Sequence, residues 1–265
     1  MRKLVQWADV LCENFKPGTL DSFGYDYQTC SAWNPALIYT TNSGFGRFGS
    51  YAKNPAYDMV VQGFSGMMHA QGGGPSHEPQ PVEWAASDEI GAMNFVQGVL
   101  MALVARYRTG KGQRMDTSQF GASIQFQMNS GIGPFLHTRQ QRDDGKRPMS
   151  GGKHIGNYFA TSDGKWFILQ PQPKKPPWHN NVFELIGRRD LCEDERFADF
   201  YKQGRNRDAL EEELQKTFIQ NTQQHWLAMF NEAQIACGPV HSYTDLIDND
   251  TPWANGYLEK VAVPQ

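Results

Sequence analysis

The stretch of sequence that decides the fold is SDEIGAMNFVQGVLMALVARYRTGKGQRMDTS, residues 87–118. Ser87 and Asp88 are residue types that cap helix N-termini, and Gly110 follows a basic last turn, as is typical of a helix C-terminus. Between these ends the apolar residues recur at steps of three and four, the spacing of an amphipathic helix; they are Ile90, Met93, Val96, Leu100 and Leu103. The pattern predicts a helix over 88–108, capped by Ser87 or Asp88.

Strands and glycine-rich loops are predicted on the N-terminal side of this helix. ADVLCENF (8–15) mixes β-branched and apolar residues and predicts a buried strand, and LIYTTN (37–42) predicts a second strand. The segment 59–68 is apolar but interrupted by glycine, so its periodicity does not decide between helix and strand. Residues 71–81 are rich in glycine and proline and predict a loop.

The loop after the second predicted strand contains the pattern GxGxxG, at Gly44, Gly46 and Gly49. A dinucleotide-binding site requires such glycines to open a helix. Pro55 and the lack of apolar periodicity after the glycines argue against an immediate helix. We therefore interpret this segment as a loop that exposes its backbone to a ligand or to a neighbouring side chain.

A second α/β lobe is predicted on the C-terminal side. Residues 158–161 and 165–170 flank the turn sequence SDG and predict a β-hairpin. Further helices are predicted over 120–133, from Trp178, over 207–218 and over 223–232. The charged, glycine-rich segment 138–153 is the best candidate for a boundary between the two lobes.

Composition and charge exclude several classes of function. The 265 residues include 25 Lys and Arg and 28 Asp and Glu, for a net charge of −3, which predicts no affinity for nucleic acid or anionic membranes. No run of about 18 apolar residues is present, so no membrane span is expected. The four cysteines form no CxxC pair and the seven histidines form no HExxH pair. A reduced, cytoplasmic protein without a local metal site is therefore expected.

Asp88 is the sharpest candidate for a catalytic group. The helix dipole and the free amides of a first turn are expected to keep its carboxylate ionised, and nucleophilic attack requires an ionised carboxylate. A purely structural cap remains the alternative, because Asp is a common capping residue. Tyr57 and Asp58 form a second polar pair, which either faces the same cleft or belongs to a surface turn.

Four segments resemble the class III CoA-transferases, the formyl-CoA transferase or CaiB/BaiF family, in order and in approximate spacing. They are ADVLCENFKPGTLDSFGYDY (8–27), NPALIYTTNSGFGRFGSYAKNPAYD (34–58), the stretch 87–118 quoted above, and ACGPVHSYTDLIDND (236–250). The matched segments span nearly the whole chain. Each alone is moderately specific, and four in sequence are strongly specific.

The resemblance implies a fold class and a reaction. The fold is expected to be α/β: part of a Rossmann-type large domain over 1–135, a linker over 136–150, a smaller α+β domain over 151–235 and a return linker over 236–265. The implied reaction moves coenzyme A from an acyl-CoA donor to a small carboxylic acid through an aspartyl-CoA thioester on Asp88. Coenzyme A and acyl-CoA are then substrates, and no tightly bound cofactor or metal is expected.

The resemblance also implies a CoA site, a glycine loop over the aspartyl intermediate and a homodimer. The CoA-binding and loop positions fall on Asn14, Phe15, Lys16, Tyr57, Gly151 and Gly152. Family members resembling this sequence form interlocked dimers, which implies a homodimer here. Compared with the family pattern, the sequence is expected to lack both family termini.

Two alternatives to a CoA-transferase stay open. The same fold hosts α-methylacyl-CoA racemases, which pair the Asp at the helix start with a His that precedes the Asp of the PxYD segment. Here that position is Tyr57, so a two-base proton exchange lacks its partner. The second alternative is an inactive module that binds CoA or another subunit.

Overall fold

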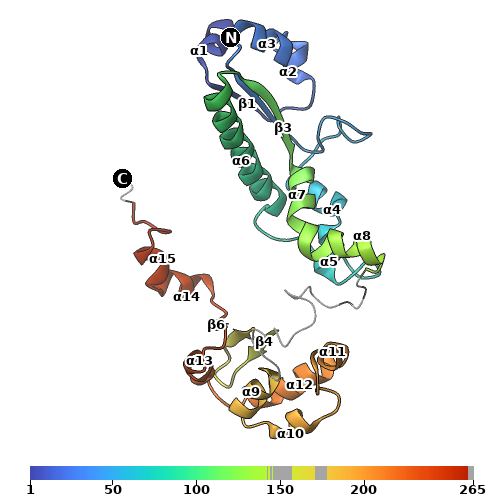
Figure 1. Cartoon of the computed structure of the whole chain (residues 1–265), viewed down its shortest axis with the longest axis vertical. Helices are drawn as coiled ribbons and strands as arrows, with labels where there is room; N and C mark the ends of the chain where they lie inside the picture. Colours follow the sequence, from blue (N-terminus) through green and yellow to red (C-terminus); the bar gives the residue numbers. More distant parts are fainter. Residues whose placement is uncertain (142, 144, 146–156, 171–177, 262–265) are drawn as a thin grey trace. The chain divides into compact units, whose positions relative to one another are not determined.

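The computed structural model describes residues 1–141, 143, 145, 157–170 and 178–261. The chain divides into two compact units, Met1–Pro148 and Met149–Gln265, coloured blue to green and yellow to red in Figure 1. Within the described residues, each unit has its own sheet of three strands.

The sheet of the first unit is parallel, in the order β1 (Val10–Glu13), β2 (Ile38–Ser43), β3 (Gln113–Ser118). β2 lies in the centre and is almost entirely buried, which confirms the second predicted strand. β1 was predicted to be buried but contains no fully buried residue, because it pairs on one side only within the described sheet. The three strands run in the same direction, so their carboxyl ends meet at one edge, where ligands of open α/β sheets bind.

One face of this sheet packs against α1 (Arg2–Trp7) and α3 (Tyr27–Trp33). The core between them contains Val5, Cys30 and Tyr39, all at most 2% exposed. α2 (Thr19–Ser22) lies in the loop that follows β1. These helices are blue in Figure 1.

The other face packs against the long helix α6 (Ala86–Thr109). The helix agrees closely with the predicted range, and it ends at Gly110 with φ of 70°. The buried positions of the helix, however, include the small residues Gly91, Gly98 and Ala102, of which Gly98 lies against β3 and Gly91 against Gln119 of α7 (Gln119–Gln127). Gly98 lies so close to Met115 of β3 that a Cβ at this position would be 2.8 Å from the Met115 sulfur.

Three of the five apolar residues of the predicted stripe do not form this contact, whereas Ile90 and Leu103 are half-buried. Met93, Val96 and Leu100 are between 55% and 63% exposed. The reason is geometric: at Gly98 the helix lies so close to β3 that a larger side chain would overlap Met115. The periodicity therefore identified the helix but not the face that packs on the sheet.

α6 is, among the described residues, the one helix that is long and apolar enough to cross a membrane. The sequence led us to expect no such segment. The helix is this apolar because no charged residue lies between Glu89 and Arg106, although Asn94 and Gln97 interrupt its apolar run. A single helix of this kind is weak evidence for a membrane span, and α6 packs against β2 and β3.

The short helices α4 (Asp58–Phe64) and α7 pack against α6, and further short helices adjoin them. Residues 59–68, left undecided by the sequence, fall in α4 and α5 (Met67–Gly72). α7 follows β3 directly, and a π-helical turn (Met128–Ile132) joins it to α8 (Gly133–Thr138). The predicted helix over 120–133 is thus confirmed, with a π-helical end.

The second unit contains an antiparallel sheet, β4 (Asn157–Ala160), β5 (Trp166–Leu169) and β6 (Cys237–Pro239). One side of it packs against a core that includes Phe167, Phe183, Leu214 and Phe218, which are fully buried. The predicted hairpin and the helices over 207–218 and 223–232 are confirmed. The helices of this unit are α9 (Trp178–Leu185), α10 (Arg189–Glu193), α11 (Phe200–Arg205), α12 (Arg207–Phe218), α13 (Gln223–Glu232), α14 (Tyr243–Asp248) and α15 (Thr251–Ala254).

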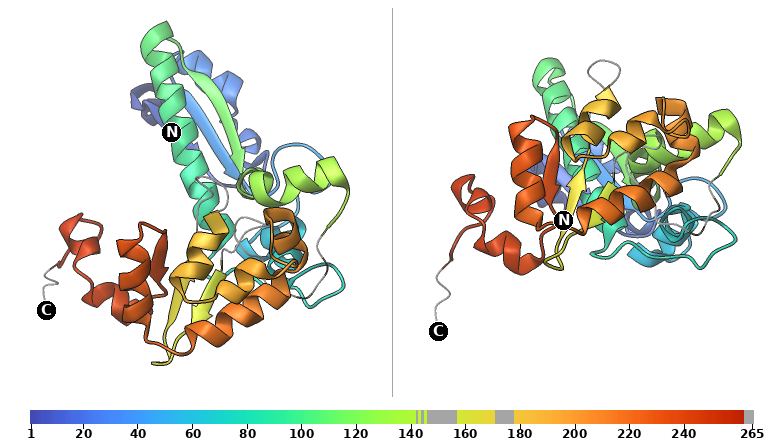
Figure 2. Two further views of the ribbon diagram at one scale, coloured as in Figure 1. Left: turned by 60° about the horizontal axis from the view of Figure 1, so that its bottom comes forward. Right: turned by 90° about the horizontal axis from the view of Figure 1, so that it is seen from below.

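Residues 236–265, expected to be a return linker, contain regular structure. β6 pairs with β5 through Leu169 and Cys237, and α14 and α15 follow it. Figure 2 shows these C-terminal elements in red in two further views.

Candidate active site

Asp88 lies in the first turn of α6, at the carboxyl edge of the parallel sheet. The helix follows β2 in the chain and precedes β3, so its N-terminus lies where the strands end. The two residues before it, Trp84 and Ala85, have φ of 64° and 51°. Left-handed backbone in consecutive residues other than glycine is strained, and such strain is concentrated at functional sites.

The amides at the start of α6 are capped by Asp58 of α4. Its Oδ1 accepts hydrogen bonds from the Ser87 amide at 2.8 Å, the Ser87 hydroxyl at 2.6 Å and the Asp88 amide at 3.3 Å. The predicted cap by Ser87 or Asp88 is therefore wrong: the N-cap position is Ala85, which makes no side-chain cap. A carboxylate from a neighbouring helix replaces the local cap, and this leaves the Asp88 side chain available for another role.

The two neighbouring carboxyl groups titrate differently. Burial raises the pKa of Asp58, but the hydrogen bonds from Ser87, and then from Gln62, outweigh burial and hold this pKa below its usual value. The pKa of Asp88 is raised, first by the partial burial of its carboxyl group and then by the negative charges of Asp58 and Glu89. This direction is opposite to the expected effect of a helix N-terminus, because Asp58 already occupies the helix amides.

The Gln119 side chain contacts the Asp88 carboxylate. Its Nε2 donates a hydrogen bond to Oδ1 of Asp88 from the first position of α7. Glycines border it on two sides: a Cβ at Gly91 would lie 3.3 Å from Cγ of Gln119, and one at Gly44 would lie 3.8 Å from its Oε1. Gln119 was not among the predicted site residues, because β3, whose end places Gln119 at the edge of the sheet, was not predicted from the sequence.

The glycine loop after β2 does not open a helix, as predicted. The next helix, α4, begins only at Asp58. Gly46 and Gly49 have φ of 88° and 92°, and the carbonyl of Gly44 accepts a hydrogen bond from the Phe120 amide at 3.0 Å. The start of this loop is therefore hydrogen-bonded to the start of α7, where Gln119 lies.

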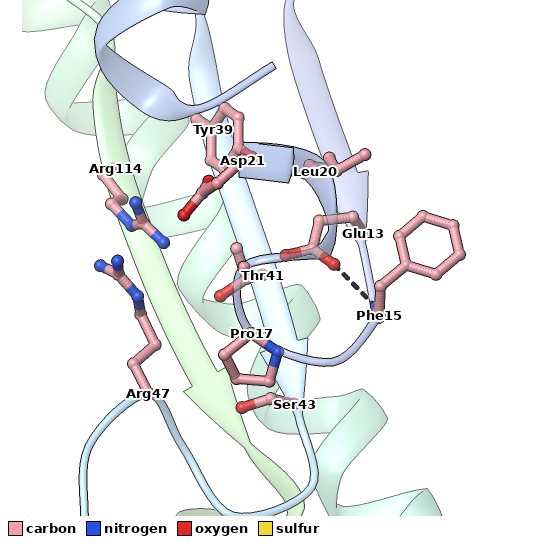
Figure 3. A pocket seen from close by; sticks show the side chains of 11 residues that line it. Glu13, Phe15, Pro17, Leu20, Asp21, Tyr39, Thr41, Ser43, Arg47 and Arg114 are labelled. Carbon is pink, nitrogen blue, oxygen red and sulfur yellow. Dashed lines mark hydrogen bonds between the residues drawn. The ribbon is translucent and has the colours of Figure 1, made fainter. Parts of the chain in front are cut away.

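A small pocket lies at the same edge of the sheet, at the end of β1 (Figure 3). Phe15 lines this pocket, whereas Asn14 and Lys16 are exposed and do not line it. Tyr57 is 78% exposed and also lies outside it. The lining residues are Glu13, Phe15, Pro17, Gly18, Leu20, Asp21, Tyr39, Thr41, Ser43, Arg47 and Arg114. Of the six positions expected for CoA and the glycine loop, the pocket thus contains one, and Gly151 and Gly152 lie outside the described residues.

The pocket contains two arginines that share one carboxylate partner. Arg114 and Arg47 lie 3.0 Å and 3.6 Å from Asp116 of β3. Burial raises the pKa of Asp116, but hydrogen bonds from Arg114 and Thr41 outweigh burial and lower it. The Arg114 guanidinium also lies over the ring of Tyr39, 5.4 Å from its centroid. Arg47, Arg114 and Asp116 together carry two positive charges and one negative charge. The two arginines lie on the side of the pocket opposite Glu13 and Asp21.

A family model described as CoA-transferase family III matches residues 1–265. The chain belongs to this family. It is 35% identical to acetyl-CoA:oxalate CoA-transferase from Acetobacter aceti, over 90% of this chain and 60% of that protein. It is 28% identical to formyl-CoA:oxalate CoA-transferase from Streptomyces coelicolor, over 100% of this chain and 67% of that protein.

Solved structures of this family have the same fold. A CaiB/BaiF family protein from Brucella suis matches with a TM-score of 0.77 and 31% identity, over 96% of this chain and 66% of that chain. Rv3272 from Mycobacterium tuberculosis matches with a TM-score of 0.81 and 25% identity, over 97% of this chain and 67% of that chain. The α/β class expected from the sequence is confirmed. The chain spans 60% to 64% of the length of the first three curated relatives.

Proposed function

We propose that this family III chain moves coenzyme A from an acyl-CoA donor to a small carboxylic acid, with Asp88 as the nucleophile. One observation carries the proposal. The Asp88 backbone is held by Asp58, and Gln119 holds one carboxylate oxygen, while the residue remains exposed. A carboxylate that is held in place through one oxygen, with its other oxygen accessible to a substrate, has the geometry that covalent catalysis needs.

The proposed reaction has two halves, one for the donor and one for the acceptor. An Asp88 oxygen attacks the thioester carbonyl, the C–S bond breaks, and coenzyme A leaves as a thiolate, which yields a mixed anhydride. The thiolate then attacks Cγ of Asp88, the bond from Cγ to the bridging oxygen breaks, and the donor acid leaves as a carboxylate. The resulting aspartyl-CoA thioester reacts with the acceptor carboxylate by the same steps in reverse, so that a new acyl-CoA leaves and Asp88 is regenerated.

The names of the relatives indicate which acids to test first. They include oxalate, citramalate, malate and glutarate, all small dicarboxylic acids, as acceptors or donors. We propose a small carboxylic acid of this kind as the acceptor and a short acyl-CoA as the donor.

The racemase alternative is disfavoured by the surroundings of Asp88. A second base is required for proton exchange. Asp58 lies next to Asp88, but its hydrogen bonds with Ser87 and Gln62 lower its pKa and make it a weak base. Tyr57 is directed to solvent, as its high exposure shows.

Trapping of the covalent intermediate tests the proposal. The purified chain is incubated with acetyl-CoA or succinyl-CoA, treated with hydroxylamine and analysed by peptide mass spectrometry. We expect a hydroxamate on Asp88, and we expect Asp88→Ala and Asp88→Asn to form none and to lose transfer to oxalate or succinate by at least about 10³-fold. Glu89→Gln, which removes the neighbouring exposed carboxylate, is the matched control and should retain transfer.

Two results would contradict the proposal. Normal turnover by Asp88→Ala would remove Asp88 from the chemistry. Stoichiometric CoA binding without any hydroxamate or transfer would favour the inactive binding module.

A further inference from the structure

We infer that Gln119 is the oxyanion donor for both tetrahedral species that form at Cγ of Asp88, an inference that rests on the proposed function. The contact that carries it is the hydrogen bond from Gln119 Nε2 to Asp88 Oδ1. An ionised carboxylate only accepts hydrogen bonds, so the amide group is oriented with its nitrogen toward Asp88 and its oxygen toward Gly44.

The backbone around Gln119 fixes the position of its side chain. The Gln119 carbonyl accepts a hydrogen bond from the Ser123 hydroxyl at 2.8 Å, and the next amide, that of Phe120, donates to the Gly44 carbonyl at 3.0 Å. Gly91 lies one turn after Asp88 on α6, and its Cα approaches Gln119 because it carries no side chain. The donor is therefore held between α6 and the glycine loop before the reaction begins.

This placement distinguishes the two oxygens of Asp88. Oδ1 is held by Gln119, so Oδ2 is the oxygen that is available to attack the acyl-CoA. After attack, Oδ2 becomes the bridging oxygen of the anhydride and Oδ1 becomes the carbonyl oxygen on Cγ. When the CoA thiolate attacks Cγ, the new negative charge develops on Oδ1, which is the atom that Gln119 already contacts.

The same donor serves the second half of the reaction. The acceptor carboxylate attacks Cγ of the aspartyl-CoA thioester, and the charge again develops on Oδ1 before the C–S bond breaks. A neutral amide donates in every one of these states without a change of protonation. Removal of one preorganised oxyanion donor lowers kcat by about 10²–10³-fold in enzymes of this chemical class.

Substitution by methionine tests the role with little change in volume. We expect Gln119→Met to slow the formation of the aspartyl-CoA adduct, followed by rapid quench and intact-protein mass spectrometry, by about 10²–10³-fold. Its melting temperature is expected to stay close to that of the wild type. Gln125→Met is the matched control, because Gln125 lies on the same helix but bonds Asn94, at 3.1 Å; its rate should be unchanged.

A pH profile separates donation from a merely structural role. In Gln119→Glu two carboxyl groups face each other and take up one shared proton as the pH falls. The singly protonated pair can donate to Oδ1, so the activity of Gln119→Glu is expected to recover partly at acid pH, whereas that of Gln119→Met is not. A structural role would give both variants the same profile.

The outcomes are distinguishable from a failure of the proposed function. If the wild type forms the Asp88 adduct and Gln119→Met forms it equally fast, the inference is overturned and the proposed function stands. If the wild type forms no adduct and Asp88→Asn behaves identically, the proposed function fails and the role of Gln119 fails with it. Loss of the adduct in Gln119→Met together with acid recovery in Gln119→Glu supports both.

Discussion

At the scale of the residue, two adjacent carboxylates have opposite roles in stability. The ionised form of Asp58 stabilises the folded protein, because the hydrogen bonds that it accepts lower its pKa. The ionised form of Asp88 destabilises the folded protein, because burial and then the charge of Asp58 raise its pKa. The fold therefore uses one carboxylate to hold the start of α6 and keeps the other in a state that is less favourable than in water. A carboxylate that lowers stability and is still present is expected to be needed for function.

Replacement of Asp88 by asparagine is expected to stabilise the protein while it abolishes transfer. The raised pKa means that the wild type loses stability as the pH rises from the unfolded value, about 3.9, through the folded value. Asp88→Asn escapes this loss, so its gain is present at neutral pH and disappears below about pH 4. The gain is expected to be a few tenths of a kcal/mol, because Asp88 is exposed and screened by solvent. Urea unfolding at pH 7 and pH 3.5 measures it; an equal difference at both pH values would contradict the argument.

At the scale of the element, α6 combines what the sequence could and could not predict. Its range follows from local periodicity and from the glycine at its end. The packing face could not be predicted, because apolar periodicity favours the side with Met93 and Leu100. The side with Gly98 packs on the sheet because β3 approaches the helix closely there. β3 itself, QRMDTS, has no apolar alternation and becomes a strand by pairing with β2.

The candidate site divides in the same way. Asp88 was predictable because helix starts have a local signature and because the family resemblance falls on it. The cap by Asp58 and the contact of Gln119 depend on residues about 30 positions distant from Asp88 in the chain. No local pattern reports such contacts. Asn14 and Lys16 follow β1, yet they do not line the pocket that their neighbour Phe15 borders.

Enlargement of Gly98 is expected to separate α6 from the sheet. A leucine would overlap Met115, whose sulfur already lies 2.8 Å from the position of a Cβ. We expect Gly98→Leu to lower the free energy of unfolding by about 1–3 kcal/mol, and to slow transfer because the helix that carries Asp88 moves. Gly98→Ala should cost less, since the flexible end of Met115 can shift and alanine favours helix by up to about 1 kcal/mol. Equal stability of Gly98→Leu and the wild type, in urea unfolding, would contradict this account of the contact.

At the scale of the whole molecule, the exposed face of α6 predicts self-association. Met93, Val96, Leu100, Met101 and Val104 are all at least 55% exposed and lie on the side of α6 away from the sheet. A contiguous apolar surface of this kind favours burial against another surface. We propose a second copy of this chain as its partner, in agreement with the dimer that the resemblance implies.

Charge on this face is expected to weaken the association. Val96→Glu with Leu100→Glu should shift the sedimentation-equilibrium mass toward one chain of 30.0 kDa, because two buried charges would be unpaired at the interface. Lys111→Glu, an exposed change just beyond the end of α6, should leave the mass unchanged. A wild-type chain that is already monomeric at micromolar concentration would contradict the proposed association.

The contact between Gly98 and Met115 also sets the rotation of α6 about its own axis. Asp58 holds the start of the helix and Gly98 fixes a point ten residues after Asp88, so the helical phase between them is not free. Each residue of an α-helix advances by about 100°. One residue inserted between Asp88 and Gly98 would thus turn the carboxylate away from Gln119, whereas an insertion in the loop before Trp84 would leave the phase intact. The tolerance of this chain to insertions and deletions therefore depends on helical phase, and we expect the segment from Asp88 to Gly98 to keep its length even where its exposed side chains vary.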